Sequence, residues 1–374
     1  MKILVAATQA GSCNALTSPI KELRKRGHDV TAYATGSEAE ARAFQDIEHQ
    51  RISLGAQEDY VRLVQGYDVI MTGLHSPHSP EGTFIRAAYQ EHIPAVGVQD
   101  QNSNYRLRLG DCIEDLPTII AVMVKECVHT MKSELPVDMA LEAVARARVV
   151  GWTALDHYAG LRESSTPHTR ENLLQELSLN PEKSHYLFLS QNISPHSKYM
   201  ENFDLLYSKK EEIFQYELQV CRAAFQAAAD VGVQLLVKPH PGEAYRIDYT
   251  KEMAEHYDFT YIPAGACSTQ QLMLAAAGVI AGRSSGLTEA CLLDRNTAAI
   301  LPDEIGRAWR KASPVISLDA IPYTLTWEGI PELMATVTSP TDEVRQALTK
   351  KRKKFSVDGK ASQRLADLVE EIGR

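Results

Sequence analysis

The chain has 374 residues, of which 44% are hydrophobic and 23% are charged, and its formal net charge is −9 at pH 7. This length is too great for one ordinary core, so two domains are expected, and the composition is that of a globular protein rather than a disordered or fibrous one. The acidic balance argues against a nucleic-acid-binding protein.

Cysteine usage and the apolar segments bear on the cellular compartment. The six cysteines are scattered without a Cys-x-x-Cys pair, so neither a zinc site nor a disulfide framework is expected. The start, "MKILVAATQAGSC", lacks the basic head and apolar stretch of a signal peptide. The longest apolar run, "TIIAVMV", is far shorter than the ~20 residues of a membrane span. We therefore expect a cytoplasmic protein without a transmembrane segment.

The first half of the chain alternates short apolar runs with segments of helical period, which predicts βα units and parallel sheets. A helix is predicted over 19–27, closed by Gly27. A glycine-containing turn is expected before this helix. A second helical pattern is predicted over 116–144, where Pro117 and Pro136 mark helix boundaries. Strands are predicted over 2–7, 29–34, 67–73, 93–99 and 147–151.

The second half opens after the polar stretch 162–173 and an acidic helix, and it closes with helices from about Pro340. Strands are predicted over 185–191, 233–239, 259–264, 277–282 and 296–301. The fold class is therefore α/β, with two Rossmann-like domains facing across a cleft that the carboxyl ends of both sheets line. The predicted boundaries are 1–160 for the first domain, 161–355 for the second and 356–374 for a C-terminal helix.

The run "LLVKPHPGE" places Lys238 and His240 where a predicted strand stops. Pro239 and Pro241 cannot donate to a strand ladder, so the strand ends at this point. In open α/β sheets the carboxyl edge of the strands is where ligands bind. Lys238 and His240 are therefore candidate ligand-binding residues, although a solvated strand end explains the pattern equally well.

The run "VIAGRSSGLTEACLLDRN" places Arg283, Ser284, Ser285 and Gly286 between a strand and a helix. Free backbone N–H groups, hydroxyls and small residues at a helix start favour an anion, above all a phosphate. Arg283 would add positive charge, and Glu289 would accept hydrogen bonds from ribose hydroxyls. The structural alternative stays open, because serines cap helices and glutamate favours the first turn.

Polar residues also follow the first strand of the second half, in "FLSQNISPHSKY". Gln191 and Asn192 are candidates for hydrogen bonds to a substrate or a phosphate at the sheet edge. A plain polar loop is the alternative.

Three loops of the first half hold candidates on the substrate side. "ATQAGSC" is not a G-x-G-x-x-G fingerprint, which disfavours a dinucleotide cofactor, but Gly11 would let a substrate approach the backbone. "MTGLHSPHSP" holds His75 and His78, and His75 is a candidate general base. "VGVQDQN" leaves Asp100 at a strand end, where it could orient or deprotonate a hydroxyl, or form an Asx turn.

The sequence resembles the GT-B superfamily of nucleotide-sugar enzymes over nearly its whole length. The resemblance rests on "LRKRGHDVTAY", "KPHPGE", "SSGLTEACLLDR" and "DGKASQRLADLVEEI". It implies that the carboxyl-terminal domain binds the nucleotide-diphosphate sugar and the amino-terminal domain binds the acceptor. His240 would then lie near the donor phosphates or sugar, Ser284, Ser285 and Gly286 at the diphosphate, and Glu289 at the ribose.

Within that superfamily the sequence favours a glycosyltransferase. It contains no Asp-x-Asp motif, so neither a metal nor another cofactor is expected. Catalytic roles would fall to His75, Asp100 and His240. A UDP-N-acetylglucosamine 2-epimerase is the alternative, although the epimerase run His-Arg-Arg-Glu-Asn is absent and its Asp-Ser-Gly-Gly reads Arg-Ser-Ser-Gly here. A non-catalytic nucleotide-sugar-binding protein is the third reading, and a homodimer is compatible with the sequence.

Overall fold

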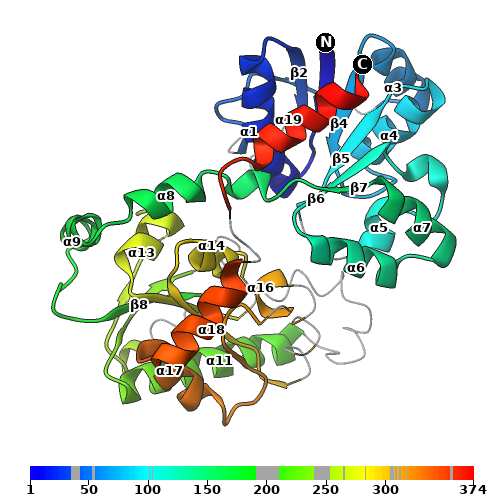
Figure 1. Cartoon of the computed structure of the whole chain (residues 1–374). Helices are drawn as coiled ribbons and strands as arrows, with labels where there is room; N and C mark the ends of the chain where they lie inside the picture. Colours follow the sequence, from blue (N-terminus) through cyan, green and yellow to red (C-terminus); the bar gives the residue numbers. More distant parts are fainter. Residues whose placement is uncertain are drawn as a thin grey trace. The chain divides into compact units, whose positions relative to one another are not determined.

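The alternation of apolar runs and amphipathic segments folds as repeated βα units in the computed structural model (Figure 1). The chain divides into Met1–Ala159 with Val357–Arg374, here called unit 1, and Gly160–Ser356, here called unit 2. The structure describes residues 1–34, 43–52, 55–100, 102, 104–190, 210–239, 253–263, 266–282, 284–303, 307, 310, 313–317, 319–353 and 357–374.

In the described part of unit 1, seven parallel strands form one sheet in the order β3-β2-β1-β4-β5-β6-β7. The strands are β1 (Lys2–Ala6), β2 (Asp29–Ala34), β3 (His49–Arg51), β4 (Val69–Gly73), β5 (Ala95–Val98), β6 (Ile119–Val122) and β7 (Ala147–Val149). The α-helices are α1 (Ala10–Lys25), α3 (Gln57–Val64), α4 (Pro80–Gln90), α5 (Tyr105–Leu109), α6 (Lys125–Glu134), α7 (Val137–Arg146) and α19 (Ala361–Ile372), and α8 (Tyr158–Ser164) spans the boundary with unit 2. The predicted strands β1, β2, β4, β5 and β7 are confirmed.

The sheet of unit 1 is buried on both faces, as β1 illustrates. Ile3 and Val5 belong to a hydrophobic cluster that includes residues of α1 and α19, such as Leu365. Leu4 and Ala6 face the other way, into a cluster with residues of α3 and α4. A strand that is covered on both faces has no polar side, which explains why β1 reads as a continuous apolar run.

Helix α1 begins earlier than the sequence predicts. It starts at Ala10 and runs through Pro19, which is buried inside it. The expected glycine-containing turn is therefore shorter, and Gly11 lies in the first helical turn. Proline favours a first helical position, which led to a predicted start at residue 19; the packing of Cys13 and Leu16 into the core favours the longer helix instead.

The helical prediction for 116–144 is wrong in its first part. Ile119–Val122 forms β6, which pairs with β5 and β7, and helices follow only from Lys125. Ile119 and Ile120 are β-branched and buried, as is typical of an inner parallel strand.

In the described part of unit 2, six parallel strands form a sheet in the order β10-β9-β8-β11-β12-β13. The strands are β8 (His185–Leu189), β9 (Gln234–Lys238), β10 (Phe259–Tyr261), β11 (Gly278–Ala281), β12 (Asn296–Ile300) and β13 (Tyr323–Thr324). The helices are α9 (Pro167–Glu176), α11 (Lys210–Asp230), α13 (Thr269–Ala275), α14 (Gly286–Leu292), α16 (Pro314–Ser317), α17 (Ile330–Thr338) and α18 (Asp342–Arg352). The five predicted strands are confirmed as β8 to β12, and β13 is an addition.

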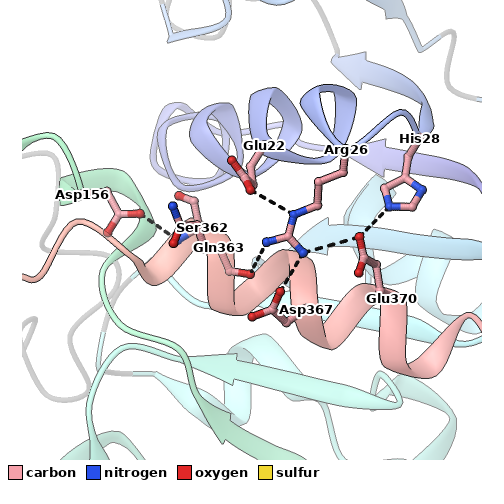
Figure 2. Close-up of polar contacts among 8 residues, drawn as sticks. All are labelled: Glu22, Arg26, His28, Asp156, Ser362, Gln363, Asp367 and Glu370. Carbon is pink, nitrogen blue, oxygen red and sulfur yellow. Dashed lines mark hydrogen bonds and ion pairs between the residues drawn. The ribbon is translucent and has the colours of Figure 1, made fainter.

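The last helix, α19, packs on α1 in unit 1 and is held there by charged groups (Figure 2). Arg26 donates from Nε to Glu22 at 2.9 Å and from Nη1 to Asp367 at 2.6 Å, and it lies 3.4 Å from Glu370. His28 Nε2 donates to Glu370 at 2.8 Å. That hydrogen bond, together with Arg26, lowers the pKa of Glu370.

The first turn of α19 is capped by a residue far away in the sequence. Asp156 accepts hydrogen bonds from the backbone N–H groups of Ala361 and Ser362, at 3.0 and 2.7 Å. Arg364 binds Asp358 through both Nη atoms and donates from Nε to the Val150 carbonyl. The amino end of α19 is thus fixed to the segment that follows β7.

Candidate functional site

Each sheet contains a topological switch point, the place where the strand order reverses. In unit 1 it lies between β1 and β4, and in unit 2 it lies between β8 and β11. In open α/β sheets, ligands bind outside the carboxyl ends of the strands at such a point. The loops that follow these strands are therefore the candidate site in each unit.

In unit 1 the structure brings Gly11 and Asp100 together. Asp100 follows β5, and a Cβ atom on Gly11 would lie only 2.2 Å from Asp100 Oδ2. Asp100 Oδ1 forms an ion pair at 2.7 Å with Arg108 Nη1, which also donates to the Leu74 carbonyl. The Asp100 and Arg108 side chains are only 12% and 10% exposed. Glycine at position 11 therefore leaves space for a carboxylate that a nearly buried arginine holds in place.

His75 lies in the loop after β4, next to the carbonyl that Arg108 binds. Its side chain is half-buried and forms no hydrogen bond with any other described residue. His78 is exposed, and its backbone N–H donates to Ser76 Oγ. Of the two histidines, only His75 adjoins the Asp100–Arg108 pair through its backbone.

Sequence reasoning missed a buried glutamate at the same switch point. Glu81, in the first turn of α4, is 0% exposed. Its carboxylate accepts from the Thr8 backbone N–H at 2.7 Å and from Thr8 Oγ1 at 2.5 Å. Burial raises the pKa of Tyr60, and the charges of Glu81 and Asp59 add to that rise. The "SPEG" pattern indicates a capped helix start, but nothing local to it shows that Glu81 binds the turn after β1.

In unit 2 the ends of neighbouring strands meet around Lys238. The Ser190 backbone N–H, after β8, donates to the Lys238 carbonyl at 3.3 Å. Lys238 Nζ donates to the carbonyl of Cys267 at 2.7 Å. Burial raises the pKa of the Cys267 thiol, and the Lys238 ammonium acts in the opposite direction. Lys238 thus lies at the predicted sheet edge, with its charge directed at the loop after β10.

The turn before α14 has the close packing that its small residues suggest. Ser284 Oγ accepts from the Gly286 backbone N–H at 3.2 Å, and the Ser285 side chain is exposed and caps nothing. A Cβ atom on Gly286 would lie 2.4 Å from Leu189 Cδ1, at the end of β8. Glu289 lies in the first turn of α14 and is half-buried. Ser284 thus binds the backbone of the first residue of α14, and the N-cap residue Ser285 forms no side-chain cap. Ser284, Ser285 and Glu289 all follow the carboxyl end of β11, beside the switch point.

Four predicted site residues lie outside the described part of the chain, namely Gln191, Asn192, His240 and Arg283. Among the described residues, no helix is long and apolar enough to cross a membrane. No group of three or more His, Cys, Asp or Glu residues in the described ranges is arranged to hold a metal ion.

No protein-family model and no curated protein matches the chain. Solved structures do match over its whole length. UDP-GlcNAc 2-epimerase from Neisseria meningitidis bound to UDP-GlcNAc is similar with a TM-score of 0.68 and 13% identity, covering 99% of this chain and 100% of that one. MurG from Acinetobacter baumannii is similar with a TM-score of 0.59 and 13% identity, covering 99% of both chains.

A glycosyltransferase from Rickettsia africae is similar with a TM-score of 0.63 and 10% identity, covering 99% of this chain and 98% of that one. At this level of identity the likeness concerns the fold. The predicted fold class is confirmed: the chain has the GT-B fold of these nucleotide-sugar enzymes, with two Rossmann-like domains.

Proposed function

We propose that this protein is a nucleotide-sugar enzyme, and more narrowly a metal-independent glycosyltransferase that moves a sugar from a nucleotide-diphosphate donor to an acceptor. The observation that carries the proposal is the full-length likeness to solved nucleotide-sugar enzymes, one of them bound to UDP-GlcNAc and another a glycosyltransferase. The predicted site residues support it, because the described ones lie at or beside the switch points of the two sheets.

The donor would bind to unit 2. In the proposed reaction the bond between the sugar and the diphosphate breaks, and negative charge grows on the departing diphosphate. Backbone N–H groups and hydroxyls at Ser284, Ser285 and Gly286 would donate hydrogen bonds that stabilise this charge, and the cationic groups of His240 and Arg283 would add to the stabilisation. Gln191 and Asn192 would add hydrogen bonds, Lys238 would hold the neighbouring loop, and Glu289 would bind the ribose.

The acceptor would bind to unit 1, where His75 is the better general base. Asp100 is already engaged by Arg108, so its carboxylate is suited to orienting the acceptor hydroxyl. The His75 side chain has no described partner and is free to take the hydroxyl proton during attack. Gly11 leaves the space that the Asp100 carboxylate occupies, beside which the acceptor would bind.

A 2-epimerase is the second candidate, because several of the similar solved structures are UDP-N-acetylglucosamine 2-epimerases. Against it, this sequence lacks the epimerase run His-Arg-Arg-Glu-Asn and has Arg-Ser-Ser-Gly in place of Asp-Ser-Gly-Gly. These changes remove acid and base groups that epimerisation would use.

Incubation with UDP-, GDP- and CMP-sugars, with and without a mixture of candidate acceptors, tests the proposal. Nucleotide release that depends on an acceptor supports the transferase. An epimerised sugar formed without any acceptor refutes it and supports the second candidate. Thermal stabilisation by a nucleotide without turnover would indicate the non-catalytic alternative; at one hundredfold excess over the dissociation constant it amounts to about 2.7 kcal/mol.

A histidine pair provides a matched control for the catalytic assignment. His75→Asn should lower kcat by about 100-fold or more, as removal of a general base does, whereas His78→Asn, three residues away and exposed, should retain activity. Equal rates for the two variants would contradict the role of His75.

A further inference from the structure

Two arginines of unit 2 lie near the amino ends of the paired strands β11 and β12, and neither forms an ion pair with a described carboxylate. Arg170, in the first turn of α9, donates from Nε to the carbonyl of Ala275, the last residue of α13, at 3.0 Å. Arg295, directly before β12, donates from Nη2 to Ser165 Oγ at 2.5 Å. Both acceptors are neutral, and in the described part of the chain neither guanidinium forms an ion pair.

The two positive charges act on one another. Burial lowers the pKa of Arg295, and the charge of Arg170 lowers it further, while Asp294 acts in the opposite direction. Asp294 is exposed and forms no ion pair with Arg295 among the described contacts. Arg170 also contributes to the lowered pKa of His185, whose main cause is burial. This edge of unit 2 therefore holds two guanidinium groups without an ion-pair partner among the described residues, and an anion between them would reduce their repulsion.

Several donors at this edge have no acceptor among the described residues. Arg295 Nε is enclosed and has no acceptor. Arg295 Nη1 and both Nη atoms of Arg170 form no hydrogen bond with a described residue. The Ser165 hydroxyl accepts a hydrogen bond from Arg295, so the hydroxyl proton of Ser165 can still be donated to a ligand. Planar guanidinium forks match the oxygens of a phosphate group, so this donor set suits a tetrahedral oxyanion.

This cluster is separate from the predicted donor site. Arg295 precedes the amino end of β12, and Ala275 lies shortly before the amino end of β11. Ser284 and Gly286 follow the carboxyl end of β11, so the strand length of roughly 13 Å separates the two places. The turn at Ser284–Gly286 and Arg295 therefore lie at opposite ends of the strands.

We propose that Arg170, Arg295 and Ser165 form a second anion site in unit 2, which binds a phosphate monoester at the sheet edge opposite to the donor site. The proposal goes beyond the transferase function and does not depend on it. Arg170 and Ser165 belong to α9 and the segment before it, while Arg295 belongs to the loop between α14 and β12, so a bound phosphate would cross-link the two.

The test is the melting temperature of the full chain in inorganic phosphate, compared with chloride at matched ionic strength. Phosphate at tenfold its dissociation constant should raise Tm by about 3 °C more than chloride does. Arg170→Gln and Arg295→Gln should each abolish this extra rise. Arg345→Gln is the matched control, because Arg345 Nε also donates to a backbone carbonyl, that of Pro340, at 3.0 Å, and this variant should keep the rise.

Ser284→Ala separates this site from the donor site and should also keep the rise. The proposal is overturned if phosphate acts no more strongly than chloride, or if the rise survives both arginine variants and disappears in Ser284→Ala. Broadening of the phosphate signal in ³¹P NMR gives a second readout if an arginine variant is poorly stable. Glycerol 3-phosphate and vesicles containing phosphatidic acid then distinguish a soluble ester from a lipid headgroup.

Discussion

The attachment of α19 to unit 1 yields a contrast between two substitutions on one helix. Leu365→Ala removes a side chain that is fully buried among residues of β1 and α1. Asp367→Asn removes the charge that faces Arg26, from a side chain that is 66% exposed. Both residues contact the same neighbouring helix, so the comparison separates apolar burial from surface charge.

The structure predicts very different costs for the two changes. Buried leucine-to-alanine substitutions lower the free energy of unfolding by 2–5 kcal/mol, so about 3 kcal/mol is expected for Leu365→Ala. Exposed ion pairs contribute about 0.2–1 kcal/mol. Arg26 also keeps its contacts with Glu22 and Glu370, which places Asp367→Asn at the lower end. For a domain of this size, Leu365→Ala should lower the Tm of unit 1 by about 6–12 °C.

Hydrogen exchange at increasing urea concentrations, read out by mass spectrometry, measures these costs for each unit. Leu365→Ala should reduce the protection of peptides from β1 and β2 in unit 1. Peptides from β8 and β11 in unit 2 should keep their protection. The reasoning is refuted if the loss is confined to the α19 peptide, or if Asp367→Asn costs as much as Leu365→Ala.

Three further predictions concern the loops and the carboxylates. Asp100→Asn should lower the stability of unit 1 by about 3 kcal/mol in urea denaturation, because it removes the negative charge that pairs with the nearly buried Arg108 guanidinium. Gly286→Ala should lower the stability of unit 2 by about 2 kcal/mol and weaken UDP-sugar binding in calorimetry, because its Cβ would lie 2.4 Å from Leu189 Cδ1. Asp358→Asn should matter only at higher pH. A hydrogen bond from Arg364 lowers the pKa of Asp358 in the folded state. The stabilisation that this carboxylate gives to the fold is therefore present above pH ~4 and is lost as the pH falls below it.

Controls from the same chain accompany these variants. Asp111→Asn breaks the exposed pair with Arg106 and should change stability by less than about 0.5 kcal/mol. Gly160→Ala adds a Cβ with no atom within 4 Å, so it should be tolerated. If Asp100→Asn were as mild as Asp111→Asn, the Arg108 contact would not stabilise the loop. A cost for Asp358→Asn that grows toward acid pH would contradict the sign given above.

Most strands were predictable because parallel sheets are buried on both faces, which leaves continuous apolar runs such as those of β1 and β8. Three strands were missed. The short strands β3 and β13 have only three and two residues and no continuous apolar run. The apolar run of β6 adjoins a segment of helical period, so local pattern alone extended the helix over it. The early start of α1 was missed for a related reason: Pro19 is a strong local signal, and tertiary packing outweighs it.

The candidate site was predictable only in part. Strand ends indicated Asp100 and Lys238, because the carboxyl edge of a sheet follows from the order of strands and helices. The partners of these two residues were not predictable, since the contacts with Arg108 and Cys267 depend on how the loops pack after folding. The pairing of Glu81 with Thr8 joins residues 73 positions apart, and no spacing rule detects such a contact.

Unit 1 contains both ends of the chain. Met1 lies close enough to Gly373 that a Cβ on that glycine would meet the methionine sulfur at 2.6 Å (Figure 1). During synthesis β1 therefore emerges before unit 2, yet its partner helix α19 emerges only after every residue of unit 2 has been made. The usual order, in which the amino-terminal domain matures first on the ribosome, is reversed here. Unit 2 can complete its core before α19 has been made, whereas the unit 1 face that α19 covers stays open until that helix follows.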